Sequence, residues 1–159
     1  MATTTHVPVE VYLRSSYEPD AEYVDGKIEE RPAAEFDHAS WHGAILAWFA
    51  QHEKEWNVLA LPSLRVWVAP TRYRVPDVSV LDRSQPREQI ITHPPVAVFE
   101  VLSPEDTVQR LKRKLQDYRV MGIEEIRVVD PQDRTTAMRT GSFYATTPSR
   151  TRERESASI

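Results

Sequence analysis

The sequence predicts a mixed α/β domain, in which a sheet of parallel and antiparallel strands carries one helix on each face. Three observations support this fold class. Apolar residues recur at helical spacing in segments 38–54 and 103–121, whereas the other apolar runs are short and strand-like. Asp25-Gly26, between two short alternating runs, is typical of a β-hairpin. Strands on both sides of segment 103–121 favour a βαβ crossover between parallel strands.

The composition is that of a globular protein and excludes several other classes. Apolar residues make up 40% of the 159 residues, and this length suits one domain with one core. No apolar run approaches the ~20 residues that cross a bilayer, and no signal peptide is expected at the start of the chain. We expect residues 1–145 to form a single domain and the polar residues 146–159 to be a disordered tail.

Cysteine content and charge restrict the site chemistry. The chain has no cysteine, which excludes disulfides and thiolate metal sites and favours a cytoplasmic location. Its net charge of −4 counts against tight, non-specific binding to DNA. Contact with nucleic acid is therefore expected to depend on a local basic patch or on cations held by acidic residues.

The first half of the chain is expected to hold two helices and several short strands. A short helix is predicted over 9–16, followed by the hairpin at Asp25-Gly26. Asp37 is the expected N-cap of the first long helix, over about 38–54. Strands are predicted over 58–61 and 64–68, and a turn region is predicted over 69–75.

The second half is expected to contain the crossover unit. Strands are predicted over 77–82 and 96–102, with a surface loop between them. Ser103, as N-cap, with Pro104 after it, predicts the start of a helix that stops at Gly122. A strand over 126–129 and an edge strand over 135–139 complete the expected sheet.

Two acids stand out because they lie in apolar strands. Glu100 shares one face of its strand with Val98, where an ionised carboxylate is costly unless it is paired or binds a metal. Asp77 begins the preceding strand, so the two acids are candidates to converge on one hard cation. Each acid also has a simpler interpretation when it is considered alone. Glu100 could reach solvent at the end of its strand, and Asp77 could be an ordinary turn residue.

A lysine on the following helix is the third candidate. Lys114 borders an apolar stripe that includes Leu111, Leu115 and Tyr118. Its side chain is long enough to bring the ammonium to the strand ends. A cation would polarise a phosphate and activate water, while a lysine would stabilise the charge that develops. The competing interpretation is that Lys114 belongs to a solvated basic face.

Several motifs follow one another in a fixed order: Glu22-Tyr23-Val24-Asp25-Gly26, His38, Val75-Pro76-Asp77-Val78, Phe99-Glu100-Val101-Leu102-Ser103-Pro104, Lys114-Leu115-Gln116-Asp117-Tyr118, Gly122 and Val129-Asp130-Pro131. They span residues 18–142. This combination resembles the bacterial Uma-two family of proposed restriction endonucleases, within the PD-(D/E)XK nuclease superfamily. The resemblance implies a restriction-endonuclease-like core and a divalent-metal-dependent endonuclease, with DNA as the expected substrate.

The resemblance also implies roles for individual residues. Asp77, Glu100 and the backbone carbonyl of Val101 would bind Mg²⁺ or Mn²⁺. Lys114 would be the catalytic lysine, displaced from the strand onto the helix, and Glu22 would be a further acid of the catalytic cluster. His38 and Tyr118 are peripheral candidates. A homodimer with one active site for each DNA strand is the expected assembly.

Two alternatives stay open at this point. His38 and His42 have the spacing of paired metal ligands on a helix, which would suit a zinc hydrolase, although no general-base glutamate follows His38. The fold could also serve as a catalytically inactive nucleic-acid-binding or dimeric scaffold. In that case phosphates would be contacted by arginines, for which the candidates are Arg65, Arg72, Arg74, Arg110 and Arg113.

Overall fold

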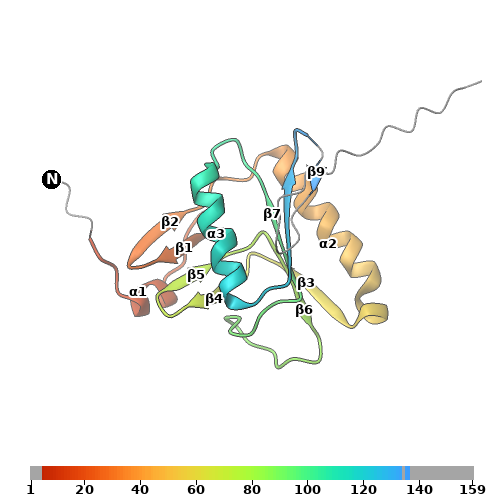
Figure 1. Cartoon of the computed structure of the whole chain (residues 1–159), viewed down its shortest axis with the longest axis horizontal. Coiled ribbons are helices and arrows are strands. Elements are labelled where there is room, and N and C mark those ends of the chain that lie inside the picture. The colour runs from red at the N-terminus through yellow and green to blue at the C-terminus, as the bar shows by residue number, and fades with distance from the viewer. Residues whose placement is uncertain (1–4, 134, 137–159) are drawn as a thin grey trace, which may run out of the picture.

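The strands form two sheets rather than one, as the computed structural model shows (Figure 1). The structure describes residues 5–133 and 135–136. Its elements are α1 (Val9–Arg14), β1 (Ala21–Val24), β2 (Lys27–Glu30), α2 (Phe36–Trp56), β3 (Val58–Pro62), β4 (Val66–Ala69), β5 (Arg72–Arg74), β6 (Val78–Asp82), β7 (Ala97–Val101), α3 (Val108–Met121), β8 (Glu125–Asp130) and β9 (Thr135–Thr136).

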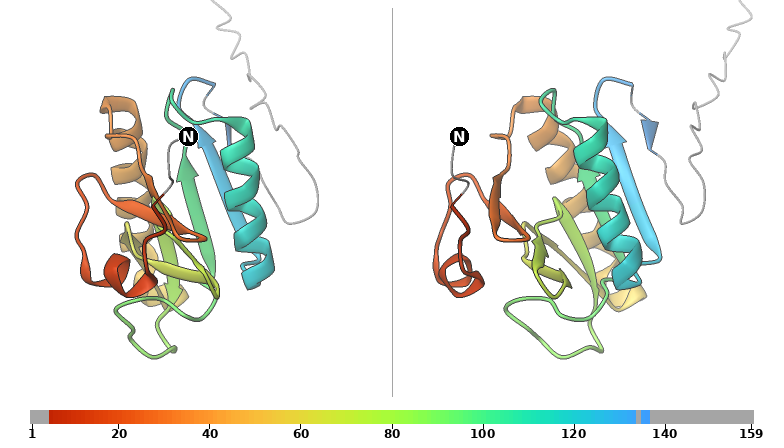
Figure 2. Two further views of the ribbon diagram at one scale, coloured as in Figure 1. Left: turned by 90° about the vertical axis from the view of Figure 1, so that its left-hand side faces the viewer. Right: turned by 60° about the vertical axis from the view of Figure 1, so that its left-hand side comes forward.

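The larger sheet has the mixed character that the sequence predicts. Its strand order is β3-β6-β7-β8-β9, and β7 pairs with β8 in parallel while the other pairs are antiparallel. Helix α3 connects the two parallel strands, which confirms the predicted βαβ crossover. Helices α2 and α3 cover opposite faces of this sheet (Figure 2).

Alternation along β7 explains how one strand serves both faces. Val98 points into a core that α3 shares through Leu115 and Tyr118. Ala97 and Phe99 point to the other face, where residues of α2 pack against them. The face that α3 covers also contains Glu100, so this acid faces the helix that follows it in the chain.

The smaller sheet is antiparallel, with strand order β2-β1-β5-β4. The predicted hairpin is confirmed as β1 and β2, joined at Asp25 and Gly26, both of which have positive φ. Strand β5 corrects the turn region predicted over 69–75, because Arg72–Arg74 pairs with both β1 and β4. Strand β4 packs against α3 and so joins the two sheets.

Both predicted helix caps are wrong, for local reasons. Helix α2 begins after Glu35, so Asp37 lies in its first turn. Helix α3 begins after Thr107, whose hydroxyl accepts a hydrogen bond from the Arg110 backbone amide. Ser103 instead belongs to a preceding turn, in which Asp106 accepts from the Ser103 amide at 2.8 Å and donates to its carbonyl at 3.0 Å.

Two further points concern the end of the chain and the length of the helices. The expected tail over 146–159 and positions 137–139 of the predicted edge strand lie outside the described residues. Among the helices that the structure describes, none combines the length and the apolar character needed to cross a membrane.

Candidate active site

Two acids meet where β6 begins and β7 ends. Val78 pairs with Phe99, and continuing this antiparallel register by one residue places Asp77 opposite Glu100. The Val101 backbone amide donates to Asp77 Oδ2 at 2.7 Å, which holds the first acid against the strand that carries the second. Both side chains are buried, with Asp77 2% and Glu100 4% exposed.

Helix α3 supplies two side chains that bind Glu100. Lys114 Nζ lies 3.4 Å from Glu100 Oε2, and the Tyr118 hydroxyl donates to Glu100 Oε1. Lys114 and Tyr118 are one helical turn apart, so they project from the same face of α3 toward the sheet. All three side chains are buried, and each oxygen of Glu100 therefore has its own donor.

Glu22 reaches the same lysine from the smaller sheet. Its Oε1 lies 3.3 Å from Lys114 Nζ and accepts from the Val75 amide at 2.9 Å. Its Oε2 accepts from Arg74 Nη1 at 3.1 Å. Lys114 consequently bridges acids that belong to two different sheets.

A buried ion pair between Arg74 and Asp117 supports this arrangement, and the sequence did not predict it. Arg74 is 1% exposed and donates through Nε to Asp117 Oδ2 at 2.7 Å. Asp117 lies on α3 between Lys114 and Tyr118, so this pair fixes the helix against β5. The signal available was the alternation of Arg72, Tyr73 and Arg74, which is the period of a strand rather than of a turn.

Arg31 and His38 approach Asp77 from the outer side. Arg31 Nη2 donates to Asp77 Oδ1, and His38 Nε2 lies 3.4 Å from Asp77 Oδ2. Arg31 lies in the connection between β2 and α2, where no periodic pattern points to it. His38, which the sequence placed at the edge of the site, lies in the first turn of α2.

These groups surround a small polar cavity of about 20 Å³. Its lining includes Asp77, Glu100, Val101, Arg31 and Lys114. This volume is enough for one water-sized species. A larger hollow of about 370 Å³, lined in part by His38 and Ser103, adjoins the cavity at the carboxyl ends of β7 and β8.

The donor set of the cavity fits a hard divalent cation. Asp77, Glu100 and the Val101 backbone line one space, as does Asp106, whose Oδ2 accepts from the Ser103 amide. Mg²⁺ is commonly held by one or two carboxylates, with water and phosphate completing its shell. Within the described ranges, no group of three or more His, Cys, Asp or Glu side chains is arranged to hold a metal ion alone. A cation in this cavity would therefore also need backbone carbonyl, water or phosphate oxygens as ligands.

The two acids of this cavity have opposite pKa shifts. Burial raises the pKa of Glu100 to about 7; the nearby charges of Asp77 and Glu22 act in the same direction, while Lys114 opposes them. Burial also tends to raise the pKa of Asp77, but the hydrogen bond from His38 and the charge of Arg31 lower it to about 2. At neutral pH Asp77 is therefore ionised, whereas Glu100 is only partly ionised in the absence of an added cation.

The structure brings the predicted residues together without testing their roles. Asp77, Glu100, Val101 and Lys114 line one cavity, Glu22 and Tyr118 bind its lysine and its glutamate, and His38 lies at its rim. The assignment of these residues as metal ligands or catalytic groups stays a prediction.

The paired-histidine alternative receives no support. The His38 and His42 ring centroids are 6.1 Å apart, and the rings are nearly perpendicular at 82°. His38 is directed at Asp77, and burial lowers the pKa of His42. No three-residue metal group that includes them occurs in the part of the chain that the structure describes.

The arginines proposed to contact phosphates bind groups of the protein itself. Arg65 lies over the Tyr12 ring and donates to the Leu13 and Ser15 carbonyls. Arg72 and Arg74 bind carboxylates. Arg110 and Arg113 lie beside Glu29, at 3.6 and 4.0 Å, and Arg110 also lines the cavity.

Two comparisons with known proteins found matches, one to a family model and one to a solved structure of similar fold. A family model described as "Uma2: Putative restriction endonuclease" matches residues 9–155. The fold matches the crystal structure of "a putative nuclease belonging to DUF820 from Anabaena variabilis ATCC 29413" with a TM-score of 0.77. The two chains are 21% identical, and the match covers 87% of this chain and 83% of the other. A search of curated proteins found no significant match.

Replacing Lys114 by Met is expected to lower the free energy of unfolding by about 3–5 kcal/mol, because Glu22 and Glu100 would lose the cation between them. Urea denaturation at pH 8 measures this loss. Lys112→Met, at an exposed position on the same helix, is the matched control and should change stability by less than about 0.5 kcal/mol. Equal effects of the two substitutions would contradict the bridging role.

Glu100 should make the metal-free protein less stable as pH rises from about 4.5 to about 7. The folded state holds a proton that the unfolded state releases across this interval, so ionisation of Glu100 opposes folding. In EDTA, Glu100→Gln should remove on the order of 2–3 kcal/mol of this pH-dependent loss.

The measurement for Glu100 is urea denaturation at pH 5 and pH 8. Glu105→Gln, at an exposed position, should leave the pH dependence as it is in the unsubstituted protein. An unchanged pH dependence in Glu100→Gln would show that Glu100 titrates normally.

Proposed function

Because the chain belongs to the Uma2 family, we propose that it is a divalent-metal-dependent endonuclease that hydrolyses phosphodiester bonds, with DNA as its substrate. The observation that carries this proposal is the convergence of Asp77, Glu100 and Lys114 on one buried polar cavity. The similar fold of a protein described as a putative nuclease supports the same class of activity.

Asp77, Glu100 and the Val101 carbonyl are the groups that would hold the cation, as Mg²⁺ or Mn²⁺. When bound, such a cation polarises phosphate oxygens and lowers the pKa of water. Burial and the nearby carboxylates of Asp77 and Glu22 raise the pKa of Glu100, so an added cation would favour its ionised form.

The residues of the chain have separate tasks in this proposal. Lys114 presents an ammonium to the cavity, where it would stabilise charge on the phosphate and orient the attacking water. Glu22 positions Lys114, since it contacts the same ammonium as Glu100 and is itself held by the Val75 amide. Tyr118 donates to one oxygen of Glu100 and so limits how that carboxylate can rotate.

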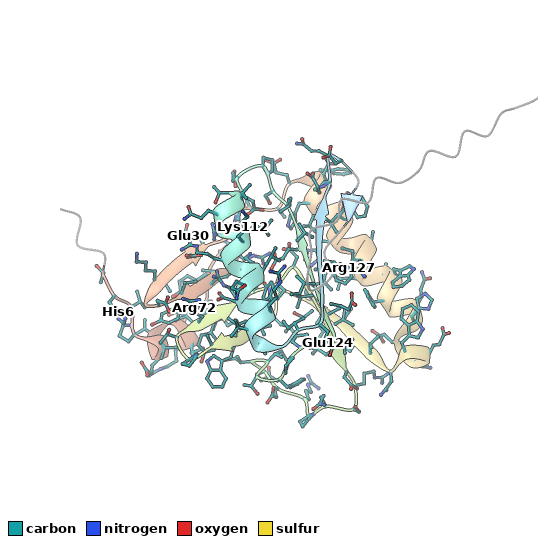
Figure 3. The ribbon with its side chains drawn as sticks, viewed as in Figure 1. His6, Glu30, Arg72, Lys112, Glu124 and Arg127 are labelled. Atoms are coloured by element: carbon teal, nitrogen blue, oxygen red, sulfur yellow. The ribbon has the colours of Figure 1, made fainter. Side chains whose placement is uncertain are left out.

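Nucleic acid would approach along the N-terminal half of α3. Arg110 lines the cavity, and Lys112 and Arg113 are exposed on the same helix. Figure 3 shows Lys112 on α3, next to Glu30 in this view. A local basic surface of this kind would let a chain with a net charge of −4 contact a phosphate backbone.

A homodimer is part of the proposal, formed through the outer surface of α2. None of the 21 residues of this helix is fully buried, and Trp48 and Trp56 are 50% and 43% exposed. Trp48 also lines an apolar hollow of about 270 Å³ with Phe49 and Phe99. Exposed apolar surface of this kind is typical of protein interfaces, and a second copy would place two active sites in one assembly. The cytoplasmic location stays a prediction.

Cleavage of plasmid DNA should require Mg²⁺ or Mn²⁺ and stop in EDTA. Asp77→Asn should reduce the rate roughly 100-fold or more, because it removes a carboxylate from the cation while retaining an acceptor for the Val101 amide. Agarose gel assays with plasmid and single-stranded substrates measure this. Asp133→Asn, at an exposed position, is the control.

Activity that survives EDTA or Asp77→Asn would contradict the proposed chemistry. DNA binding with no cleavage in either metal would favour the inactive scaffold instead.

Trp48→Glu should convert a dimer to a monomer, because the substitution puts a charge at the centre of the exposed face of α2. Size-exclusion chromatography with light scattering measures the mass. Trp67→Glu, at a tryptophan on β4 that is 40% exposed, should leave the dimer intact. A monomeric unsubstituted protein would contradict this part of the proposal.

A further inference from the structure

Arg31 is the arginine that binds Asp77, beside His38. It lies between β2 and α2, with its backbone amide bonded to the Asp20 carbonyl at 3.2 Å. Its guanidinium donates to Asp77 Oδ1, and 13% of its side chain is exposed at the rim of the cavity. Arg31 therefore has access to both the acid and the solvent side of the site.

Arg31 is held differently from Lys114. The ammonium of Lys114 lies between two acids, 3.3 Å from Glu22 and 3.4 Å from Glu100, so its position is determined from both sides. The guanidinium of Arg31 bonds to one carboxylate and sits on a long side chain anchored in a connecting segment. Of these two cations, Arg31 is the one that can leave its acid without breaking the link between the sheets.

The two oxygens of Asp77 are engaged in different ways. Oδ2 accepts from the Val101 backbone amide on β7, and His38 Nε2 lies 3.4 Å from the same oxygen. Oδ1 is the oxygen that Arg31 binds. A divalent cation that coordinates Asp77 through Oδ1 would meet the guanidinium there, and two positive groups in a poorly solvated cavity repel strongly.

We propose that Arg31 binds a backbone phosphate of the nucleic acid, and that in the free protein it covers Asp77 and competes with the divalent cation. The inference rests on the proposed function. Guanidinium binds phosphate through two parallel hydrogen bonds, so a phosphate at the cavity rim is a suitable alternative partner for Arg31. Transfer of Arg31 to the substrate frees Asp77 for the cation, which makes cation binding and substrate binding mutually favourable.

The first test uses Mn²⁺ alone, without nucleic acid. Arg31→Met should bind Mn²⁺ about fivefold more tightly than the unsubstituted protein in isothermal titration calorimetry, because the competing cation is gone. Arg87→Met is the control, since Arg87 is exposed in the connection between β6 and β7 and is not among the residues that line this cavity. Its Mn²⁺ affinity should stay within about twofold of the unsubstituted value. Unchanged or weaker Mn²⁺ binding by Arg31→Met would overturn the inference.

The second test uses plasmid DNA at saturating Mn²⁺. Arg31→Met should raise KM roughly tenfold, since a charge-assisted bond to phosphate is lost, while Arg31→Lys should recover part of that loss. An unchanged KM in Arg31→Met would overturn the proposed transfer to phosphate. Thermal denaturation of each variant establishes that it is folded before binding is measured.

A further variant separates this inference from the proposed function. Arg31→Met combined with Asp77→Asn removes both charges of the pair, and it should show no Mn²⁺ binding above background. If Asp77→Asn alone binds Mn²⁺ as well as the unsubstituted protein, the metal site itself is wrong. If Asp77→Asn abolishes binding while Arg31→Met leaves affinity and KM unchanged, only the role of Arg31 fails.

Discussion

The ammonium of Lys114, held between Glu22 and Glu100, is the contact on which the arrangement of the site depends. It joins a strand of the smaller sheet, a strand of the larger sheet and helix α3 at one buried point. Glu100 depends on this cation more than Glu22 does, because its other donor is the uncharged Tyr118 hydroxyl, whereas Glu22 also binds Arg74. The same contact that unites the two sheets also directs a lysine into the polar cavity, so folding and site assembly share one interaction.

Electrostatics then divide the site into a rigid part and an exchangeable part. Arg74, with Asp117 and Glu22, forms a buried network in which each charged group has a partner. Around Asp77 and Glu100 the balance is less complete, as the pKa of Glu100, raised to about 7 by burial, indicates. Arg31 supplies the neutralising charge on that side from the cavity rim, and a bound divalent cation would supply more. The chemistry we propose takes place at this part of the site, around Asp77 and Glu100.

The sequence was informative where a residue contradicted its surroundings. Glu100 stood out because an acid occupied the most apolar strand, and alternation correctly predicted that it shares a face with Val98. The structure shows that α3 covers this face. Asp77 stood out only in combination with Glu100. Residues that matched their local surroundings gave no such signal: Arg74 was interpreted as part of a turn, although it lies in a strand and is buried. Arg31 lies in a connection between elements, where spacing carries no information about partners.

By itself, the sequence determined the elements of the crossover unit, the hairpin at Asp25-Gly26 and the family to which the motifs belong. These features depend on local propensity and on periodicity, which are readable along a single chain. Only the tertiary structure decided that the strands divide into two sheets, that Glu22 faces Glu100 across Lys114, and that Arg31 covers Asp77. Those contacts join residues far apart in the sequence, and no local pattern encodes which distant charge a buried acid will meet.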